Sequence, residues 1–436
     1  MNLAQALRLD GAPCLALTGA GGKTTALFQL ARQLRPPVVV TTSTHLHVDQ
    51  SSLADRRRTV TRPEDLSDLD TRPLPEVLLV TGPRDGDRLT APAPDCLYWL
   101  HEFCERRRLP LLIEADGARQ RPLKAPAEHE PVVPEFVEAV LVVAGLSGLG
   151  KPLSAETVHR PEIFARLSGL EPGAPVTVEG LGRVLSHPAG GVKAIPGPAR
   201  RLALLNQAET PASLSSGGRL AEMLLAAYDC VALGSLRQGS LQAFENVAGI
   251  LLAAGEAKRY GSPKQLLDWH GRPLVRHAAE TALSAGLDPV VVVTGAAGER
   301  VEAALEGLKV RIARNPDWAS GQSSSLKAGL AALPARTGAA VFLLADQPQV
   351  PATLLRALVE RHRQERPVIL APLVGDRRAN PVLFDRLTFP ALGELSGDVG
   401  GRAVFSRFPV TYLPWQDESL LAEIDLPDDY ARLSHD

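Results

Sequence analysis

The chain has 436 residues, 45% of them hydrophobic, and its 47 basic and 49 acidic residues give a formal net charge of −2. This length predicts two or three domains, and the near-neutral charge argues against a protein that holds nucleic acid through backbone electrostatics. No apolar run reaches the roughly 20 residues of a membrane helix. No charged segment precedes an apolar core at the start, so we expect no signal peptide, no membrane and a cytoplasmic location.

The positions of the cysteines and lysines limit the kinds of binding site that the chain can contain. The four cysteines are scattered and form no Cys-x-x-Cys pair, so we expect neither a structural zinc site nor disulfides. Only eight of the 47 basic residues are lysines. Two of them, Lys23 and Lys264, fall in glycine-containing loops, where a compact point charge suits phosphate groups.

The first loop follows an apolar strand candidate at 13–18 and precedes a helix-like stretch at 26–34. Glycines let backbone amides approach phosphate oxygens, a lysine neutralises them, and a threonine hydroxyl suits Mg²⁺. The loop is shorter than the usual motif, as in the Mur ligases, because Leu17 stands at the first glycine position. The residues predicted to bind ATP or GTP here are Gly19, Gly21, Gly22, Lys23, Thr24 and Thr25, with Thr24 as a metal ligand.

A second apolar strand candidate, within 109–118, ends in Glu114 and Asp116. The two acids share one face of a strand and are typical of a Walker B segment that orders Mg²⁺. An exposed edge strand with two acids is the alternative. The polar run at 41–47, with His45 and His47, follows another short strand. Its threonines indicate either an Mg²⁺–nucleotide site or ordinary strand propensity.

The motifs at 19–25, 41–45, 114–119 and 159–162 resemble those of the YqeC-like family, over about residues 1–235. Its members are regarded as accessory proteins for selenium-dependent molybdenum hydroxylases. The resemblance therefore implies an apo molybdenum hydroxylase as partner, and it leaves the chemistry of this domain open. We expect a P-loop NTPase-like parallel sheet at 1–238, with the domain boundary in the polar stretch 234–247.

Residues 247–252 form an apolar run that enters a second loop with Gly255 and Gly261. Arg259 and Lys264 add positive charge beside its amides, which suits a nucleoside triphosphate whose pyrophosphate must be held as it leaves. Strand candidates at 289–294, 340–345 and 367–372 alternate with helical stretches such as 273–285. This alternation predicts a mostly parallel α/β three-layer sandwich, and Asp346 ends one of its strands.

The loop sequence Leu-Ala-Ala-Gly at 252–255 resembles the signature of the Mob-type nucleotidyltransferases, among them the molybdenum cofactor cytidylyltransferases. Five further stretches follow in the family's order, near 315–326, 344–348, 380–384, 397–402 and 423–430. Ala257, Tyr260 and Ala379 replace the family's usual Ser, Met and Gly. The resemblance implies a Rossmann-like, GT-A-like domain at 246–436.

The same resemblance implies transfer of CMP from CTP to molybdopterin, with pyrophosphate leaving. Arg259 is expected to hold the β- and γ-phosphates and Lys264 the charge at the α-phosphate. Asp346 and Asp425 are expected to bind Mg²⁺. No general base is needed because the attacking phosphate is already an anion. The residues expected to contact the nucleotide or pterin are Ala253, Ala254, Gly255, Gly261, Asn315 and Ser323, although a helix N-cap is the alternative role for the serine.

Three alternatives stay open from the sequence. The chain could make a guanine dinucleotide, or transfer a nucleotide to a sugar phosphate or a related small molecule. It could also be a nucleotide-gated chaperone that delivers cofactor to a hydroxylase. Ala254 stands where guanylyl relatives have glycine, and its methyl group is expected to crowd a purine, which favours CTP.

Overall fold

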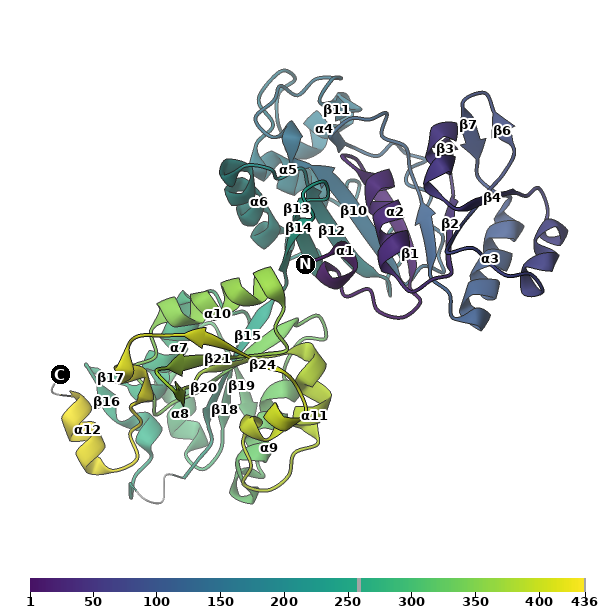
Figure 1. Cartoon of the computed structure of the whole chain (residues 1–436). Helices are drawn as coiled ribbons and strands as arrows, with labels where there is room; N and C mark the ends of the chain where they lie inside the picture. Colours follow the sequence, from purple (N-terminus) through teal and green to yellow (C-terminus); the bar gives the residue numbers. More distant parts are fainter. Residues whose placement is uncertain (257–259, 435–436) are drawn as a thin grey trace. The chain divides into compact units, whose positions relative to one another are not determined.

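The computed structural model describes residues 1–256 and 260–434. The chain divides into two compact units, Met1–Phe244 and Glu245–Asp436. Each unit is a mostly parallel sheet with helices on both faces, so the predicted α/β class is confirmed (Figure 1). Among the helices in the described part of the chain, none combines the length and the apolar character needed to cross a bilayer.

The first unit contains a nine-stranded sheet in which β14 alone runs antiparallel to its neighbour. In sheet order its strands are β14 (Ser240–Phe244), β13 (Cys230–Ser235), β12 (Arg200–Asn206), β10 (Ala139–Gly145), β1 (Cys14–Gly19), β8 (Leu111–Glu114), β2 (Val38–Thr42), β5 (Val77–Thr81) and β4 (Arg56–Thr59). Because β1 and β8 pair in parallel, the loop after β1 and the acid at the end of β8 meet at one sheet edge. The stretch 234–247, predicted to contain the domain boundary, holds β14, which forms a hairpin with β13, and the two units divide after Phe244 within this stretch.

Alternating side chains of the central strand β1 fill two cores, one on each face of the sheet. Leu15 and Leu17 pack with helices α1 (Leu3–Ala6) and α2 (Lys23–Gln33). Cys14 and Ala16 belong to the opposite core, which is covered by α3 (Pro94–Arg107), α5 (Val178–Ser186) and α6 (Pro211–Leu224). A further helix, α4 (Pro161–Ser168), packs against α5.

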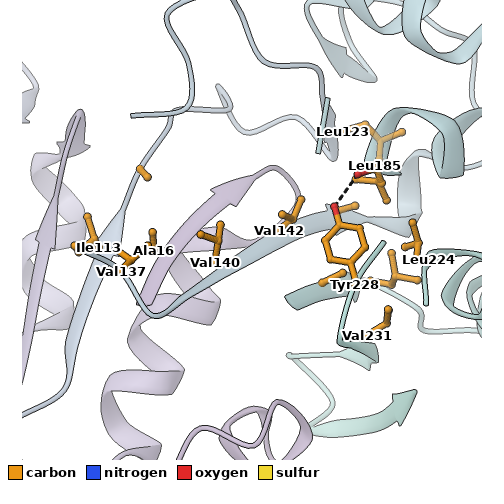
Figure 2. Close-up of a cluster of buried hydrophobic side chains, with 14 of the residues drawn as sticks. Ala16, Ile113, Leu123, Val137, Val140, Val142, Leu185, Leu224, Tyr228 and Val231 are labelled. Atoms are coloured by element: carbon orange, nitrogen blue, oxygen red, sulfur yellow. Dashed lines mark hydrogen bonds between the residues drawn. The ribbon is translucent and has the colours of Figure 1, made fainter. Parts of the chain in front are cut away.

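Tyr228 anchors this second core at one end (Figure 2). Its ring is fully buried beside Leu224 and Val231, and its hydroxyl donates a hydrogen bond of 2.7 Å to the carbonyl of Leu185 at the end of α5. Burial raises the pKa of Tyr228, so the hydroxyl keeps its proton and remains a donor. The bond ties the segment after α6 to helix α5.

Two small sheets border the edge of the large sheet where β1 ends. One consists of β3 (His45–His47), β7 (Arg88–Thr90) and β6 (Arg84–Asp85). The other pairs β9 (Leu123–Lys124) with β11 (Val158–His159) in parallel. They bring histidines and cations from distant parts of the sequence to this edge.

The second unit contains an eight-stranded sheet. Its order is β19 (Val310–Arg314), β18 (Val290–Thr294), β15 (Val247–Ala253), β20 (Ala339–Leu344), β23 (Val382–Asp385), β21 (Ile369–Val374) and β22 (Arg377–Arg378), and β24 (Val410–Pro414) pairs with β21. Strand β23 runs antiparallel to both of its neighbours. The parallel strands β15 and β20 lie side by side, so the loop after β15 and the segment after β20 share one edge.

Strand β15 alternates in the same way as β1. Val247 and Leu251 pack with α7 (Leu274–Ser284), α8 (Gly298–Ala304) and α10 (Ala352–Glu365). Ala248 and Ile250 face α9 (Gln322–Ala331) and α11 (Phe389–Gly393). The remaining elements are β16 (Asp268–Trp269), β17 (Arg272–Pro273) and α12 (Pro427–Ser434). Trp269 and Leu433 share a small separate core.

We predict that Tyr228→Phe lowers the free energy of unfolding of the first unit by about 1–3 kcal/mol, because the buried carbonyl of Leu185 loses its donor. Urea unfolding followed by circular dichroism measures the change. Tyr98→Phe is the matched control, since Tyr98 is 54% exposed, and we expect a change within about 0.5 kcal/mol. Equal stability of the two variants would contradict the role given to this bond.

Candidate active sites

In the second unit, a cavity of about 530 Å³ opens at the edge where β15 and β20 end. Five of the predicted residues line it: Ala253, Ala254, Gly255, Lys264 and Asp346. The parallel strands β15 and β20 end at the same sheet edge. Ala253, Ala254 and Gly255, at the end of β15, therefore lie close to Asp346, which follows β20.

Lys264 is the centre of this site. Its ammonium donates hydrogen bonds to Asp346 Oδ2 at 2.8 Å, to Asp425 Oδ1 at 3.0 Å and to the carbonyl of Ile424 at 2.7 Å. Burial alone lowers the pKa of Lys264, but the two carboxylates outweigh it and raise the pKa. The lysine therefore carries a full charge. The segments that carry Lys264, Asp346 and Asp425 are far apart in the sequence, and the ammonium of Lys264 brings them together.

A further acid, Glu423, increases the negative potential of the site. Burial, followed by the charges of Asp346 and Asp425, raises the pKa of Glu423. Its carboxylate accepts a hydrogen bond of 2.6 Å from Gln347 Nε2. Three acids close enough to repel one another need a nearby cation.

The two carboxylates suit a divalent metal. Asp346 and Asp425 already share one cationic partner, and carboxylate oxygens are the ligands that Mg²⁺ prefers. Over residues 1–256 and 260–434, no group of three or more His, Cys, Asp or Glu side chains is arranged to hold a metal ion. A metal held here would therefore rely on this carboxylate pair together with oxygens of a substrate, as Mg²⁺ commonly does at phosphates.

Two predicted residues of this unit are buried and bonded to protein groups. Asn315 donates hydrogen bonds to Ser324 Oγ at 2.8 Å and Ser325 Oγ at 3.0 Å. Ser323 donates to the carbonyl of Gly397 at 2.7 Å. Both residues position the start of α9, whose Gln322 and Ser325 line the cavity. Gly261 is exposed with a φ of 81°, and Arg259 lies outside the described residues.

Ala254 lines the cavity, yet its side chain is largely buried. Ala254 is 4% exposed and belongs to the core between β15 and α9. A Cβ placed on Gly295 would lie 2.8 Å from the Ala254 methyl, so that methyl packs against Gly295. The steric argument for a pyrimidine base at this position stays a prediction.

Sequence reasoning missed several residues of this cavity. Gln265 is buried, and its amide donates to the carbonyls of Ala253 at 3.2 Å and Gly255 at 3.1 Å, which fixes the backbone after β15. Trp318, Gln322 and Asp398 also line the cavity. Trp318, Gln322 and Asp398 stand in or beside the family-like stretches of the sequence, so those stretches could have identified them. Gln265 does not.

In the first unit, the glycine-rich loop runs from β1 into α2, but its first amides are already used. Gly19 donates to Asp116 Oδ2 at 3.0 Å, Ala20 to the carbonyl of Val143 at 2.8 Å, and Gly21 to the carbonyl of Arg121 at 3.1 Å. The amides left for a phosphate are those of the first turn of α2, which have no partner within a helix. The donors therefore come from Lys23, Thr24 and Thr25 more than from the glycines.

A row of alternating charges starts at this loop. Lys23 Nζ lies 3.1 Å from Asp116 Oδ1 and donates to the carbonyl of Gly19 at 2.7 Å. Lys124 Nζ then bridges Asp116 Oδ2 at 2.8 Å and Glu130 Oε2 at 2.6 Å. Arg160 closes the row with a bidentate contact to Glu130, at 2.7 and 3.0 Å. We call this row the charge chain: Lys23, Asp116, Lys124, Glu130 and Arg160.

The cations of the charge chain lower the pKa of Glu130. Burial opposes the charge on Glu130, but hydrogen bonds from Arg160 and Lys124 outweigh it and lower the pKa of Glu130 to about 2. Asp116, 2% exposed, lies between two lysines and also accepts the Gly19 amide. Its contacts in the structure are those of an anchor for the loop, and they leave the Mg²⁺ role predicted for it to Glu114.

Thr24 and Glu114 lie together, as a Walker-type site requires. Thr24 Oγ1 donates to Glu114 Oε2 at 3.3 Å and accepts a hydrogen bond of 2.7 Å from Gln50 Nε2, a residue that the sequence reading missed. A cavity of about 580 Å³ is lined by six predicted residues: Gly21, Gly22, Lys23, Thr24, Thr25 and Glu114. The hydroxyls of Thr41 and Thr42 instead donate to the carbonyls of Val80 and Glu114.

Comparison with known proteins assigns a family to each unit. The YqeC protein family matches residues 15–162, and the MobA-like NTP transferase domain matches residues 249–412. A nicotine blue oxidoreductase of Paenarthrobacter nicotinovorans is 38% identical over 196 residues, which cover 43% of this chain and 96% of that protein. The chain belongs to the MobA-like NTP transferase family and, through its first unit, to the YqeC family.

Two further relatives match one unit each. The uncharacterized protein YqeC of Escherichia coli (strain K12) is 36% identical over 200 residues, covering 44% of this chain and 75% of that protein. The purine catabolism protein PucB of Bacillus subtilis (strain 168) is 31% identical over 198 residues, covering 42% of this chain and 93% of that protein. The predicted fusion is thereby confirmed, and its MobA-like unit is a nucleotidyltransferase.

Glu114 gives the YqeC-like unit a measurable pH dependence. Burial raises the pKa of Glu114 from 4.5 to about 7, against the opposing charge of Lys23. The folded state therefore holds this proton up to neutral pH, whereas the unfolded chain releases it near pH 4.5. The stability that the bound proton contributes is complete below pH 4.5 and is lost as the pH rises through about 7.

We predict that Glu114→Gln removes this dependence. Between pH 4.5 and 7.5 the unfolding free energy of the parent should fall by about 3 kcal/mol relative to the variant, since each pKa unit is worth about 1.36 kcal/mol. Urea unfolding across this pH range measures the difference. Glu102→Gln, at an exposed position on α3, should follow the parent. Parallel curves for parent and Glu114→Gln would refute the assignment.

Proposed function

We propose that the MobA-like unit transfers CMP from CTP to molybdopterin-bound molybdenum, giving the cytosine dinucleotide cofactor and pyrophosphate. The observation that carries this proposal is that Lys264 and Asp346 line a cavity at the ends of β15 and β20 and that Lys264 also contacts Asp425. Nucleotidyl transfer needs compensating charge around a triphosphate more than it needs proton transfer. A charged lysine beside two carboxylates provides the elements of such a site.

Each residue has a distinct task in this proposal. Asp346 and Asp425 would hold Mg²⁺, which supplies charge neutralisation at the phosphates when it is bound. Lys264 contributes its positive charge at the α-phosphate, and Arg259 grips the β- and γ-phosphates. Gln265 holds the backbone after β15 through the carbonyls of Ala253 and Gly255. The attacking phosphate of molybdopterin is an anion, so no side chain has to remove a proton.

The choice of CTP over GTP follows from the resemblance to cytidylyltransferases and from the predicted crowding of a purine by Ala254, which lines the cavity. Guanylyl transfer is the alternative within the same chemistry. Incubating the protein with molybdenum cofactor and each triphosphate separately, then identifying the dinucleotide, decides between them. Equal turnover of CTP and GTP would refute the cytidylyl assignment and leave nucleotidyl transfer standing.

For the YqeC-like unit we propose accessory nucleotide binding, with ATP or GTP on the first turn of α2 and Thr24 and Glu114 at its Mg²⁺. The contact between Thr24 and Glu114 supports this assignment. An apo molybdenum hydroxylase is the proposed recipient of the finished cofactor. In a non-enzymatic alternative, the whole chain acts in nucleotide-gated delivery of the cofactor. Dinucleotide formation by the purified protein would show that delivery is not its only role.

We predict that Asp346→Asn lowers dinucleotide formation by several orders of magnitude. The change keeps size and hydrogen bonding but removes a charge that would hold Mg²⁺, and metal charge stabilisation is worth several kcal/mol at about 1.4 kcal/mol per tenfold. Dinucleotide yield in a timed assay measures this. Asp376→Asn, in an exposed turn, should match the parent. A loss of less than tenfold would show that Asp346 is not a metal ligand.

We also predict that the two sites fail independently. Lys23→Ala should weaken binding of ATP or GTP to the full chain while transfer from CTP persists, because Lys23 contacts only groups of its own unit. Thr24→Ala tests the same site with the ion pair of Lys23 intact. Nucleotide affinity and dinucleotide formation are measured on both variants, with circular dichroism as the check of folding. Loss of dinucleotide formation in either variant would mean that the two sites are functionally coupled.

A further inference from the structure

We propose that the YqeC-like unit binds a second small molecule, one that bears a carboxylate or phosphate group, in the 580 Å³ cavity beside the glycine-rich loop. We call this the second-anion site, and its residues are Arg119, Gln120, Arg121 and Gln207. The inference rests on the proposed function in one respect, namely that a nucleotide occupies the first turn of α2. It extends that function from nucleotide binding to a two-substrate site.

The first observation is strain in the cavity wall. The described chain contains nine non-glycine residues with positive φ, and four of them line this cavity: Arg119 at 46°, Gln120 at 59°, Arg160 at 66° and Gln207 at 65°. Such backbone is energetically unfavourable and gathers at functional sites. By contrast, Arg108 and Arg366 cap helix C-termini, where a left-handed residue is common.

The second observation is the chemistry of these side chains. Arginine and glutamine end in planar groups, and the arginine fork matches a carboxylate or phosphate in a bidentate contact. Gln207 Oε1 accepts a hydrogen bond of 2.6 Å from Ser147, which leaves the Gln207 amide as a donor toward a ligand. The strained residues therefore present donors, which is what an oxyanion requires.

The third observation is unbalanced charge. Lys23 and Arg160 line the cavity too, but both are neutralised by the acids of the charge chain. Within the part of the chain that the structure describes, Arg119 and Arg121 have no ion-pair partner. Burial and nearby cations lower the pKa of His159 to about 4, so this cavity residue is neutral at pH 7 and its ring can hydrogen-bond without adding charge.

The position of the second-anion site relative to the glycine-rich loop follows from one backbone contact. Gly21 donates to the carbonyl of Arg121, so the segment that carries Arg119 and Arg121 touches the loop. A cavity of about 580 Å³ lies well within the range of small-molecule sites, about 300–1,000 Å³. Phosphates on the first turn of α2 would thus lie beside a second set of donors, in the same enclosure.

The test uses the full chain, saturated with the non-hydrolysable analogue AMP-PNP and Mg²⁺. Malonate and inorganic phosphate are titrated in separate calorimetric experiments, so that the two arms distinguish a carboxylate from a phosphate ligand. We expect at least one probe to bind, and the double variant Arg119→Gln/Arg121→Gln to weaken it at least tenfold. Affinity for AMP-PNP should stay within twofold. Arg35→Gln removes an exposed charge outside the cavity and should change neither affinity.

Three results would overturn the second-anion site. They are no binding of either probe, unchanged probe binding in the double variant, and a loss of AMP-PNP affinity in the double variant, which would assign the arginines to the nucleotide. Failure of the parent protein to bind either AMP-PNP or GMP-PNP would instead overturn nucleotide binding by this unit. In that case the same titrations without nucleotide, compared between the parent and the double variant, decide whether the second-anion site exists.

Discussion

An ammonium group surrounded by oxygen acceptors is the interaction on which both candidate sites depend. Lys264 reaches two carboxylates and the carbonyl of Ile424, and Lys124 reaches Asp116, Glu130 and the carbonyl of Gly117. Removing Lys264 would leave Asp346 and Asp425 without the cation that they share, whereas removing Lys124 would interrupt the charge chain between Asp116 and Glu130. Lys264, Asp346 and Asp425 lie far apart in the sequence, so Lys264 also ties together segments that share no strand or helix, whereas the partners of Lys124 lie within the stretch 116–130.

These positions require lysine in particular. A lysine ammonium donates in three directions from one point, whereas an arginine donates in a plane. The acceptors around Lys264 come from Asp346 on one segment and from Ile424 and Asp425 on another. In a chain with eight lysines among 47 basic residues, lysine is present where a point donor must satisfy converging oxygens.

The sequence predicted the parts of these sites that belong to regular elements. The order of an apolar strand, glycines, a lysine and a helix identified the loop around Lys23. An apolar strand that ends in an acid identified Glu114 and Asp346. It could not show which amides of the first loop remain for a ligand, because that depends on carbonyls from other segments, such as those of Val143 and Arg121. Lys124, Glu130 and Arg160 come from loops and two-residue strands without periodicity. Nor could the sequence show the surroundings of the Ala254 methyl, since these depend on its tertiary neighbour Gly295.

The burial of these lysines has a consequence for chemical labelling. Lys23 and Lys124 are buried, Lys193 and Lys264 are half-buried, and all four donate hydrogen bonds to protein oxygens. Lys151, Lys309 and Lys327 are the exposed lysines among the described residues. Among the described lysines, amine-directed reagents should therefore react first at Lys151, Lys309 and Lys327 and more slowly at Lys23, Lys124, Lys193 and Lys264. Reagents directed at carboxylates or arginines would map its surface far more densely.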